Sequence, residues 1–295
     1  MPWTVRSSPE ALCLVTNGEV KIAEAFQHAN ILMLGEVHDN QEHHVLQARL
    51  VKSPKIIGPA AVVFEQIRAD QQGALDKFVD FNAHARRLGT TGDLLEFLDW
   101  KNSPWAKTAD YRPLFEAVVS ARLPIYPGDP PREVIRKAAK EGSGAALSAG
   151  DRARLWLDKP LGPAQDAASL ADIEASHCGM IPKSAQPNMA AAQRYRDAHM
   201  ADALIRAANS HGSAILIAGN GHVRTDRGVP WYIRQRAPER KVVSVMLVEV
   251  EAGQNDPETY VPRDPDGKPA TDFIIFTPKA ERTDPCLSMK APAPK

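Results

Sequence analysis

The sequence lacks a net charge, and it also lacks long apolar runs. Its 36 Lys and Arg residues balance 36 Asp and Glu residues, so no overall field attracts nucleic acid or an anionic membrane. No apolar run approaches the length of a transmembrane helix. No basic segment followed by a long apolar stretch is visible at the N-terminus, so the sequence shows no signal peptide and assigns no localisation. We expect no nucleic-acid partner and no transmembrane segment.

Cysteine is scarce, and several catalytic signatures are missing. Cys13, Cys178 and Cys286 are an odd number at long, unrelated spacings, which fits neither a disulfide framework nor a zinc finger. The motifs HEXXH, GXSXG, GXGXXG and Walker A are absent. The usual signatures of zinc proteases, serine hydrolases and nucleotide-binding proteins therefore do not apply, and the function must be sought in other residues.

Short apolar runs rich in β-formers do recur, separated by stretches with helical spacing. Continuous apolar runs joined by helical crossovers predict an α/β fold with a mainly parallel sheet flanked by helices. The block from about 130 to 210 is too long for a simple crossover and predicts an inserted helical subdomain or lid. We expect one domain over 1–280 and a disordered, Pro-rich tail over 281–295. The predicted strands lie at 31–34, 60–65, 123–126, 213–218, 241–250 and 272–276.

Polar groups follow several of these strands. In open α/β sheets, ligands bind outside the carboxyl ends of the strands, where the loops converge. The polar stretches at these ends are Gly35–Asp39, Glu65–Gln66, Pro127–Asp129 and Gly219–Arg224. Because a hydrophobic core does not require such residues, we expect a ligand site at this edge.

The first strand is followed by the densest cluster, LGEVHDNQEHH at 34–44. Glu36 and His38 are two residues apart and project to one side of an extended chain, so they could share a ligand. Asp39 and Glu42 have the spacing of a capping box for the next helix. Of the two histidines at 43 and 44, one is expected to face inward and the other to be exposed.

Two further strand ends supply a carboxylate and a histidine. Glu65 ends an apolar strand and must be hydrogen-bonded, metal-bound or paired, for which Arg68 is the nearest partner along the chain. His222 lies in a glycine-flanked turn. The set Glu36, His38 and His222, with Glu65 beside it, has the ligand types of a divalent Zn, Mn or Fe site. The alternative for each histidine is a turn or core position without a ligand.

Arginines and one loop pair complete the candidates. Arg224 suits a carboxylate or phosphate, with a solvated surface position as the alternative. Arg194 lies in the helix expected over 188–209, whose Ala and Met residues either pack in the core or line a cavity for a flat apolar ligand with carboxylates. His177 and Cys178 are either a soft ligand pair or an incidental loop pair.

Five motifs in the chain together resemble the ChaN family. These are haem-binding uptake proteins in a superfamily with the Tiki metalloproteases, TraB-like proteins and erythromycin esterases. The motifs follow the family's order and extend from about residue 25 to 235. They are GEVHDNQEHHVLQ (35–47), AVVFEQ ending at Gln66, SHCGMIP (176–182), AQRYRDAHM (192–200) and AGNGHVRTDRGVP (218–230).

The resemblance implies an α/β fold with a helical insertion, and haem binding linked to iron uptake. It also implies a homodimer around the ligand, and relatives are often exported or membrane-anchored. A tyrosine is the expected axial ligand in the family, although the resemblance does not identify which of the five here would have this role. The residues expected to bind the haem are Glu36, His38, His222, Arg224 and Arg194.

Two other functions remain open. Elsewhere in the superfamily the same residues form a hydrolytic site, in which Glu36, His38 and His222 would hold a divalent metal that activates water. A metal-free version would use His38 as general base, oriented by Glu65. In the third interpretation the polar cluster only stabilises the fold. We favour haem because SHCGMIP and AQRYRDAHM resemble the haem-binding branch.

Overall fold

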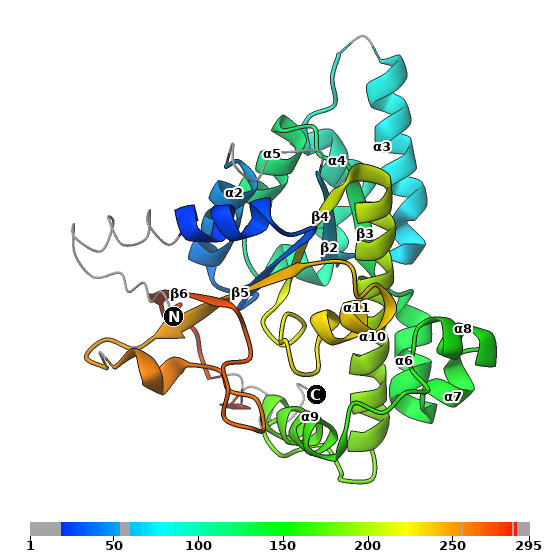
Figure 1. Ribbon diagram of the computed structural model, residues 1–295. Helices are drawn as coiled ribbons and strands as arrows, with labels where there is room; N and C mark the ends of the chain where they lie inside the picture. The colour runs from blue at the N-terminus through cyan, green and yellow to red at the C-terminus, as the bar shows by residue number, and fades with distance from the viewer. Residues whose placement is uncertain (1–18, 54–59, 86, 255, 285, 288–295) are drawn as a thin grey trace, which may run out of the picture.

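A computed structural model describes residues 19–53, 60–85, 87–254, 256–284 and 286–287, which form a six-stranded sheet (Figure 1). All strand pairs are parallel, in the order β3-β2-β4-β1-β5-β6. Each predicted apolar run overlaps one strand, which confirms the predicted α/β class. The strands are β1 (Ile31–Glu36), β2 (Ala60–Arg68), β3 (Ile125–Asp129), β4 (Ser213–Gly219), β5 (Val242–Val250) and β6 (Phe273–Pro278).

Helices cover both faces of the sheet, which explains the continuous apolar runs. On one face, Leu32 and Leu34 of β1 belong to a core completed by α2 (Gln41–Val51), α3 (Gln72–His84), α4 (Thr91–Phe97) and α5 (Arg112–Ser120). On the other, Ile31 and Met33 pack with α10 (Gln186–His211) and α11 (Val229–Arg236). Short 3-10 helices occur at η1 (Ala69–Gln71), η2 (Trp100–Asn102), η3 (Pro104–Lys107) and η4 (Pro257–Tyr260).

The connection from β3 to β4 contains five helices in the region where a helical insertion is predicted. The 26-residue α10 runs along the sheet and continues past its edge, beside α6, α7 and α9 (Figure 1). Its buried alanines, such as Ala198 and Ala201, allow close packing on the strands. The remaining helices are α6 (Arg132–Glu141), α7 (Ser143–Ala146), α8 (Ala149–Arg154) and α9 (Pro163–Ser176).

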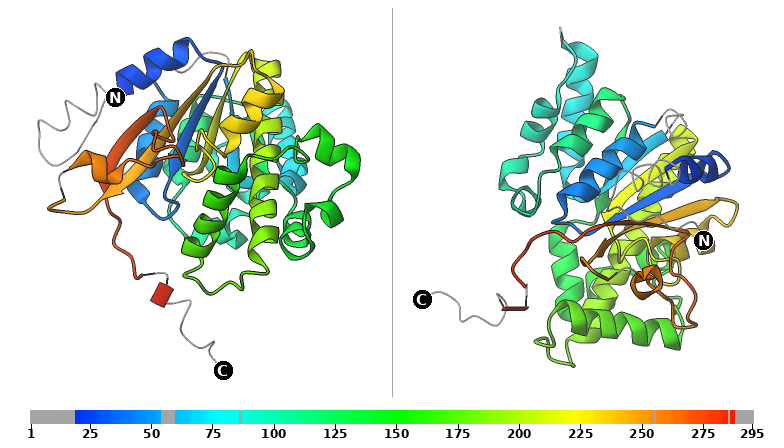
Figure 2. Two further views of the ribbon diagram at one scale, coloured as in Figure 1. Left: turned by 60° about the horizontal axis from the view of Figure 1, so that its bottom comes forward. Right: turned by 90° about the vertical axis from the view of Figure 1, so that its left-hand side faces the viewer.

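A disulfide joins Cys178, just after α9, to Cys286 near the C-terminus, with 5.6 Å between their Cα atoms. The spacing argument against disulfides was wrong for this pair, because residues 108 positions apart meet only through the fold. Arg282 also pairs with Asp39. The predicted disordered tail, 281–295, thus contains attached residues, while 288–295 and Cys13 lie outside the described residues. Figure 2 shows the chain leaving the sheet after β6.

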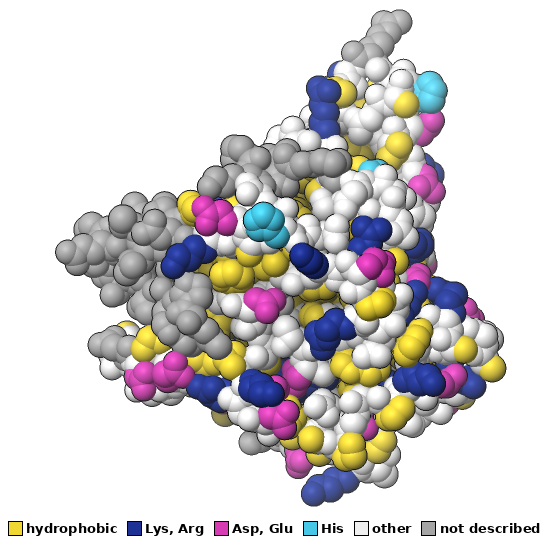
Figure 3. All heavy atoms as spheres, in the orientation of Figure 1, with side chains coloured by type: hydrophobic (Ala, Val, Ile, Leu, Met, Phe, Trp, Pro, Cys, Tyr) yellow, Lys and Arg dark blue, Asp and Glu magenta, His cyan; other side chains and the backbone are white. Residues whose placement is uncertain are grey.

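The surface carries both signs of charge. In the face shown in Figure 3, Lys and Arg side chains are interspersed with Asp and Glu, in keeping with the balanced composition. Among the described residues, no helix has both the length and the apolar character needed to cross a bilayer.

Candidate ligand site at the carboxyl edge of the sheet

The buried carboxylate of Glu36, at the end of β1, gathers three donors on one oxygen. Its Oε1 accepts hydrogen bonds from the Tyr111 hydroxyl (2.5 Å), His38 Nδ1 (2.8 Å) and Gln66 Nε2 (2.9 Å). Burial alone would raise the pKa of Glu36, but hydrogen bonds and positive charge from His38 and His44 lower it to about 2. Glu36 is thus an anion at neutral pH.

Helix α2 starts differently from the prediction. Its N-cap is Asn40, whose side chain accepts from Glu42 N at 3.0 Å, whereas the predicted cap Asp39 instead pairs with a C-terminal arginine. Both His43 and His44 are fully buried, so the expectation that one is exposed was wrong. His43 lies 2.7 Å from Thr277 Oγ1, and His44 stacks on a tyrosine ring, because this helix start is covered by β6 and α5.

Glu65, in β2, is the second buried carboxylate, and its partner comes from α10. Arg196 Nη2 donates to Glu65 Oε1 at 2.6 Å, and the Gly219 backbone N–H donates to Oε2 at 2.7 Å. The sequence neighbour Arg68 was the wrong partner, because it pairs with Asp70 at 2.9 Å. Burial would raise the pKa of Glu65, but the charges around it hold that pKa well below its usual range.

His222 is buried between two carboxylates. Its Nδ1 lies 2.6 Å from Asp197 Oδ1, and its Nε2 lies 3.4 Å from Glu65 Oε1. Burial would lower the pKa of His222, but the charges of Glu65 and Asp197 raise it to about 9. Both ring nitrogens therefore carry protons at neutral pH.

His38 links the two carboxylates and borders the open space. Its Nδ1 is bonded to Glu36, and its Nε2 lies 3.8 Å from Glu65 Oε1. Burial lowers its pKa, but the negative charges of Glu65 and Glu36 outweigh this and leave the pKa raised. A Cβ at Gly219 would lie 2.7 Å from His38 Nε2, so this close approach requires glycine. The four predicted residues thus meet at the strand ends, in a series of contacts from Glu36 to His38, from His38 to Glu65 and from Glu65 to His222.

A cavity of about 670 Å³ opens beside these residues. The strand ends form its floor, while α9, the first half of α10 and the loop after β4 form its walls. Its lining mixes polar side chains, on the floor and on the walls, with apolar ones. The apolar side chains are those of Val37, Ile173, Ala175, Ala190, Met246 and Pro262.

The predicted arginines both line this cavity. Arg224 pairs with Asp226 at 2.9 Å, and Asp226 also pairs with Arg227. Arg194 donates to the Tyr232 hydroxyl (3.0 Å) and to a backbone carbonyl (2.6 Å), which are both uncharged. Within the described ranges no carboxylate pairs with Arg194, so its charge is available to an anionic ligand.

Sequence reasoning missed the supporting residues from helices. Arg196, on the same helix as Arg194, is bound by Glu65 and by Asp129 (2.7 Å). Asp197 and Tyr111 were not identified, although Asp197 follows Arg196 in the motif AQRYRDAHM. In the part of the chain that the structure describes, no group of three or more His, Cys, Asp or Glu side chains is arranged to hold a metal ion. The metal set stays a prediction.

The chain is similar to several known proteins. The structure of ChaN of Campylobacter jejuni, reported with cofacial haem binding, matches with a TM-score of 0.60 and 20% identity, over 80% of this chain and 87% of that chain. An erythromycin esterase mutant in its open conformation matches with a TM-score of 0.42 and 13% identity, over 85% of this chain and 77% of that one. No curated protein matches. The family model "Haem-binding uptake, Tiki superfamily, ChaN" matches residues 22–233, and the chain belongs to this family.

Proposed function

We propose that this protein binds haem in the cavity at the carboxyl edge of its sheet, as part of haem or iron uptake. The observation that carries the proposal is this cavity, which combines apolar side chains with the charge of Arg194, a side chain that pairs with no carboxylate of the described residues, in a member of a haem-binding family. Haem is a flat apolar macrocycle with two carboxylates. A volume of about 670 Å³ lies within the range of roughly 300–1,000 Å³ that is usual for cofactor sites.

The lining fits the two chemical parts of haem. Val37, Ile173 and the alanines offer an apolar surface to the macrocycle. Arg194 and Arg224 would bind the propionates, since guanidinium–carboxylate pairs are strong, charge-assisted hydrogen bonds. Glu36, His38 and His222 would form the polar floor. A homodimer around the ligand remains a prediction, which sedimentation with and without hemin would check.

A hemin titration of a cavity-filling variant tests this proposal. Gly221 lines the cavity, and a Cβ built there meets no atom within 4 Å; the same holds for Gly73 in α3, far from the cavity. Neither glycine has a left-handed backbone, so a side chain adds little strain. We expect hemin to give a saturable Soret shift with the wild type and Gly73→Trp, and a loss of binding of at least tenfold with Gly221→Trp.

Two results would contradict the proposal. A wild-type protein that gives only the spectrum of free hemin would exclude haem binding by this chain. Unchanged binding by Gly221→Trp would show that haem binds elsewhere on the molecule. The bulky side chain would then not block the site that the haem occupies. Circular dichroism of the three proteins shows whether the comparison is between folded proteins.

Hydrolysis is the second candidate, and the contact between Glu36 and His38 favours it. A carboxylate bonded to Nδ1 orients a histidine as general base, and the His38 side chain is 33% exposed beside the cavity. The orienting group nearest to His38 is Glu36 rather than Glu65, which lies 3.8 Å away. In the metal-dependent version, Glu36, His38 and His222 would hold the ion, which requires His222 to release one of its ring protons. Activity assays on ester and peptide substrates with added Mn, Co or Zn test both versions. A wild-type protein with no more activity than His38→Gln would exclude both.

A further inference from the structure

Helix α9 forms a wall of the cavity without packing into the core. None of its 14 residues, all of which the structure describes, is buried, whereas the neighbouring α10 buries eleven. Ser169, Asp172, Ile173 and Ser176 line the cavity and recur at the spacing of one helix face. A surface helix normally packs this face against a core. Here the face borders open space, so displacement of α9 exposes little buried apolar surface.

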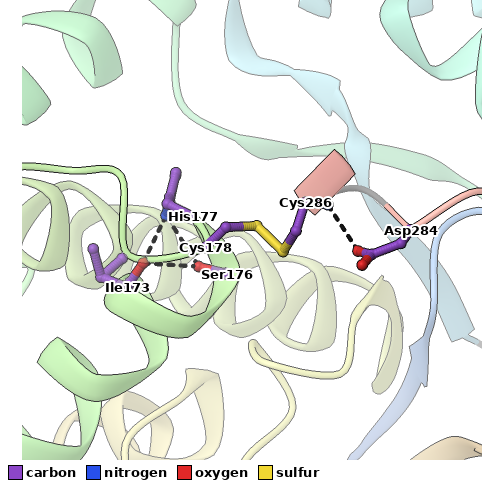
Figure 4. Close-up of a disulfide and its surroundings, with 6 residues drawn as sticks. All are labelled: Ile173, Ser176, His177, Cys178, Asp284 and Cys286. Carbon is purple, nitrogen blue, oxygen red and sulfur yellow. Dashed lines mark hydrogen bonds between the residues drawn. A yellow bond between two sulfur atoms is a disulfide. The ribbon is translucent and has the colours of Figure 1, made fainter. Parts of the chain in front are cut away.

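Both ends of α9 are joined to the rest of the chain by non-helical backbone. Gly162, the N-cap, has φ 126° and ψ 151°, a conformation that essentially only glycine adopts. At the other end, Cys178 and Gly179 have left-handed φ values of 57° and 69°. The disulfide between Cys178 and Cys286 fixes this C-terminal end to the segment that follows β6 (Figure 4). The N-terminal end of α9 is therefore the end that can move.

Two arginines hold this helix from the side of the cavity. Arg227 Nη2 donates to the carboxylate of Asp172 in α9. Arg194 Nη2 donates at 2.6 Å to the carbonyl oxygen of Lys159, three residues before the N-cap. Both arginines line the cavity, so the groups that hold α9 in place are also groups that an anionic ligand meets there.

Release of Asp172 leaves no buried charge without a partner. The Asp172 side chain is 61% exposed and enters water when it leaves Arg227. Arg227 keeps its second carboxylate, Asp226, which also pairs with Arg224. Two guanidinium groups then share one carboxylate, and the excess positive charge attracts an anionic ligand. Opening of the helix therefore has a low electrostatic cost and prepares the cavity for such a ligand.

From these contacts we infer that α9 is a lid that controls entry to the cavity. The pair between Asp172 and Arg227 holds it closed, and its N-terminal end moves outward when this pair breaks. The inference rests on the proposed function only for the identity of the ligand. Open and closed molecules are in equilibrium before the ligand arrives, so loss of the ion pair raises the open fraction.

Distances between two spin labels test the lid. Ala164 on α9 and Val45 on α2 are exposed, and both are replaced by cysteine in a Cys13→Ser background, where the native disulfide leaves no other free thiol. We expect a major and a minor distance, with the minor fraction about threefold larger in Asp172→Asn, since an ion pair with an exposed partner is weak. Glu174→Gln removes an exposed carboxylate from the same helix and should match the wild type.

The kinetics of hemin binding test the role of the lid. Stopped-flow absorption should show hemin association about threefold faster for Asp172→Asn than for the wild type and Glu174→Gln, because more molecules are open. Equal association rates would show that α9 does not control entry.

The outcomes separate the lid from the function on which its ligand rests. A single, identical distance between the labels in all three proteins would overturn the lid. Two distances whose fractions do not respond to Asp172→Asn would overturn the role of the ion pair. If the wild type binds no hemin, the proposed function fails, while the label distances still decide whether α9 opens.

Discussion

At the scale of single residues, the site depends on compensating buried charges. Glu36, Glu65 and Asp197 are nearly inaccessible to solvent, and each contacts a histidine or an arginine. A buried carboxylate is costly in isolation, so these groups are stable only as a set. Loss of one partner should therefore lower the free energy of unfolding much more than loss of a surface ion pair does.

Arg196 is the partner whose removal tests this most directly. Arg196→Met leaves the carboxylates of Glu65 and Asp129 without their guanidinium, and breaking such a buried pair costs about 3–5 kcal/mol of unfolding free energy. Arg68→Met, which breaks the exposed pair with Asp70, should cost less than about 1 kcal/mol. Urea unfolding of both variants measures the difference. Equal losses of unfolding free energy would contradict the interpretation that these buried charges compensate one another.

At the scale of elements, the helix α2 is tied to β6 through a buried histidine. His43 accepts from the Val37 backbone N–H at its Nδ1, while its Nε2 contacts Thr277. Burial lowers its pKa to about 4. The folded protein thus holds His43 neutral at a pH where the unfolded chain is protonated.

This shift predicts an acid-dependent loss of stability. The contribution of His43 is fully present above its ordinary pKa of 6.5 and is lost as the pH falls from 6.5 toward about 4, because the unfolded state then binds the additional proton. The total loss of unfolding free energy is on the order of 3 kcal/mol. Urea midpoints between pH 7 and 4 should fall less steeply for His43→Gln than for the wild type. His84→Gln, an exposed control, should follow the wild type, and parallel curves for all three would contradict the prediction.

The same elements explain which parts of the fold could be predicted. Strands such as β1 and β4 are buried on both faces, so their apolar runs are continuous and visible in the sequence. The polar residues Glu36, Glu65 and His222 are visible because they follow such runs directly. Arg196 and Asp197 lie on a long helix, where spacing does not tell which residues reach the strand ends. Cys178 and Cys286 could not be paired because only the tertiary fold brings them together.

At the scale of the whole molecule, the disulfide joins the helical insertion to the C-terminal segment. The bond connects residues separated by 108 positions and lies next to His177, which lines the cavity. Disulfides persist in oxidising compartments, so we expect this protein to function in one. Reduction would release the C-terminal segment and loosen the turn after α9.

Removal of this bond gives the prediction for the whole fold. Closing a loop of about 100 residues stabilises a protein by about 4–5 kcal/mol in the chain-entropy account, so Cys178→Ser/Cys286→Ser should lose much of that stability. Dithiothreitol should have the same effect on the wild type and none on the variant, while Cys13→Ser controls for the loss of a thiol. Haem affinity should fall in parallel, because the turn after α9, which lines the proposed cavity, loses an anchor. A variant with wild-type urea midpoint and hemin affinity would show that the bond supports neither the fold nor the site.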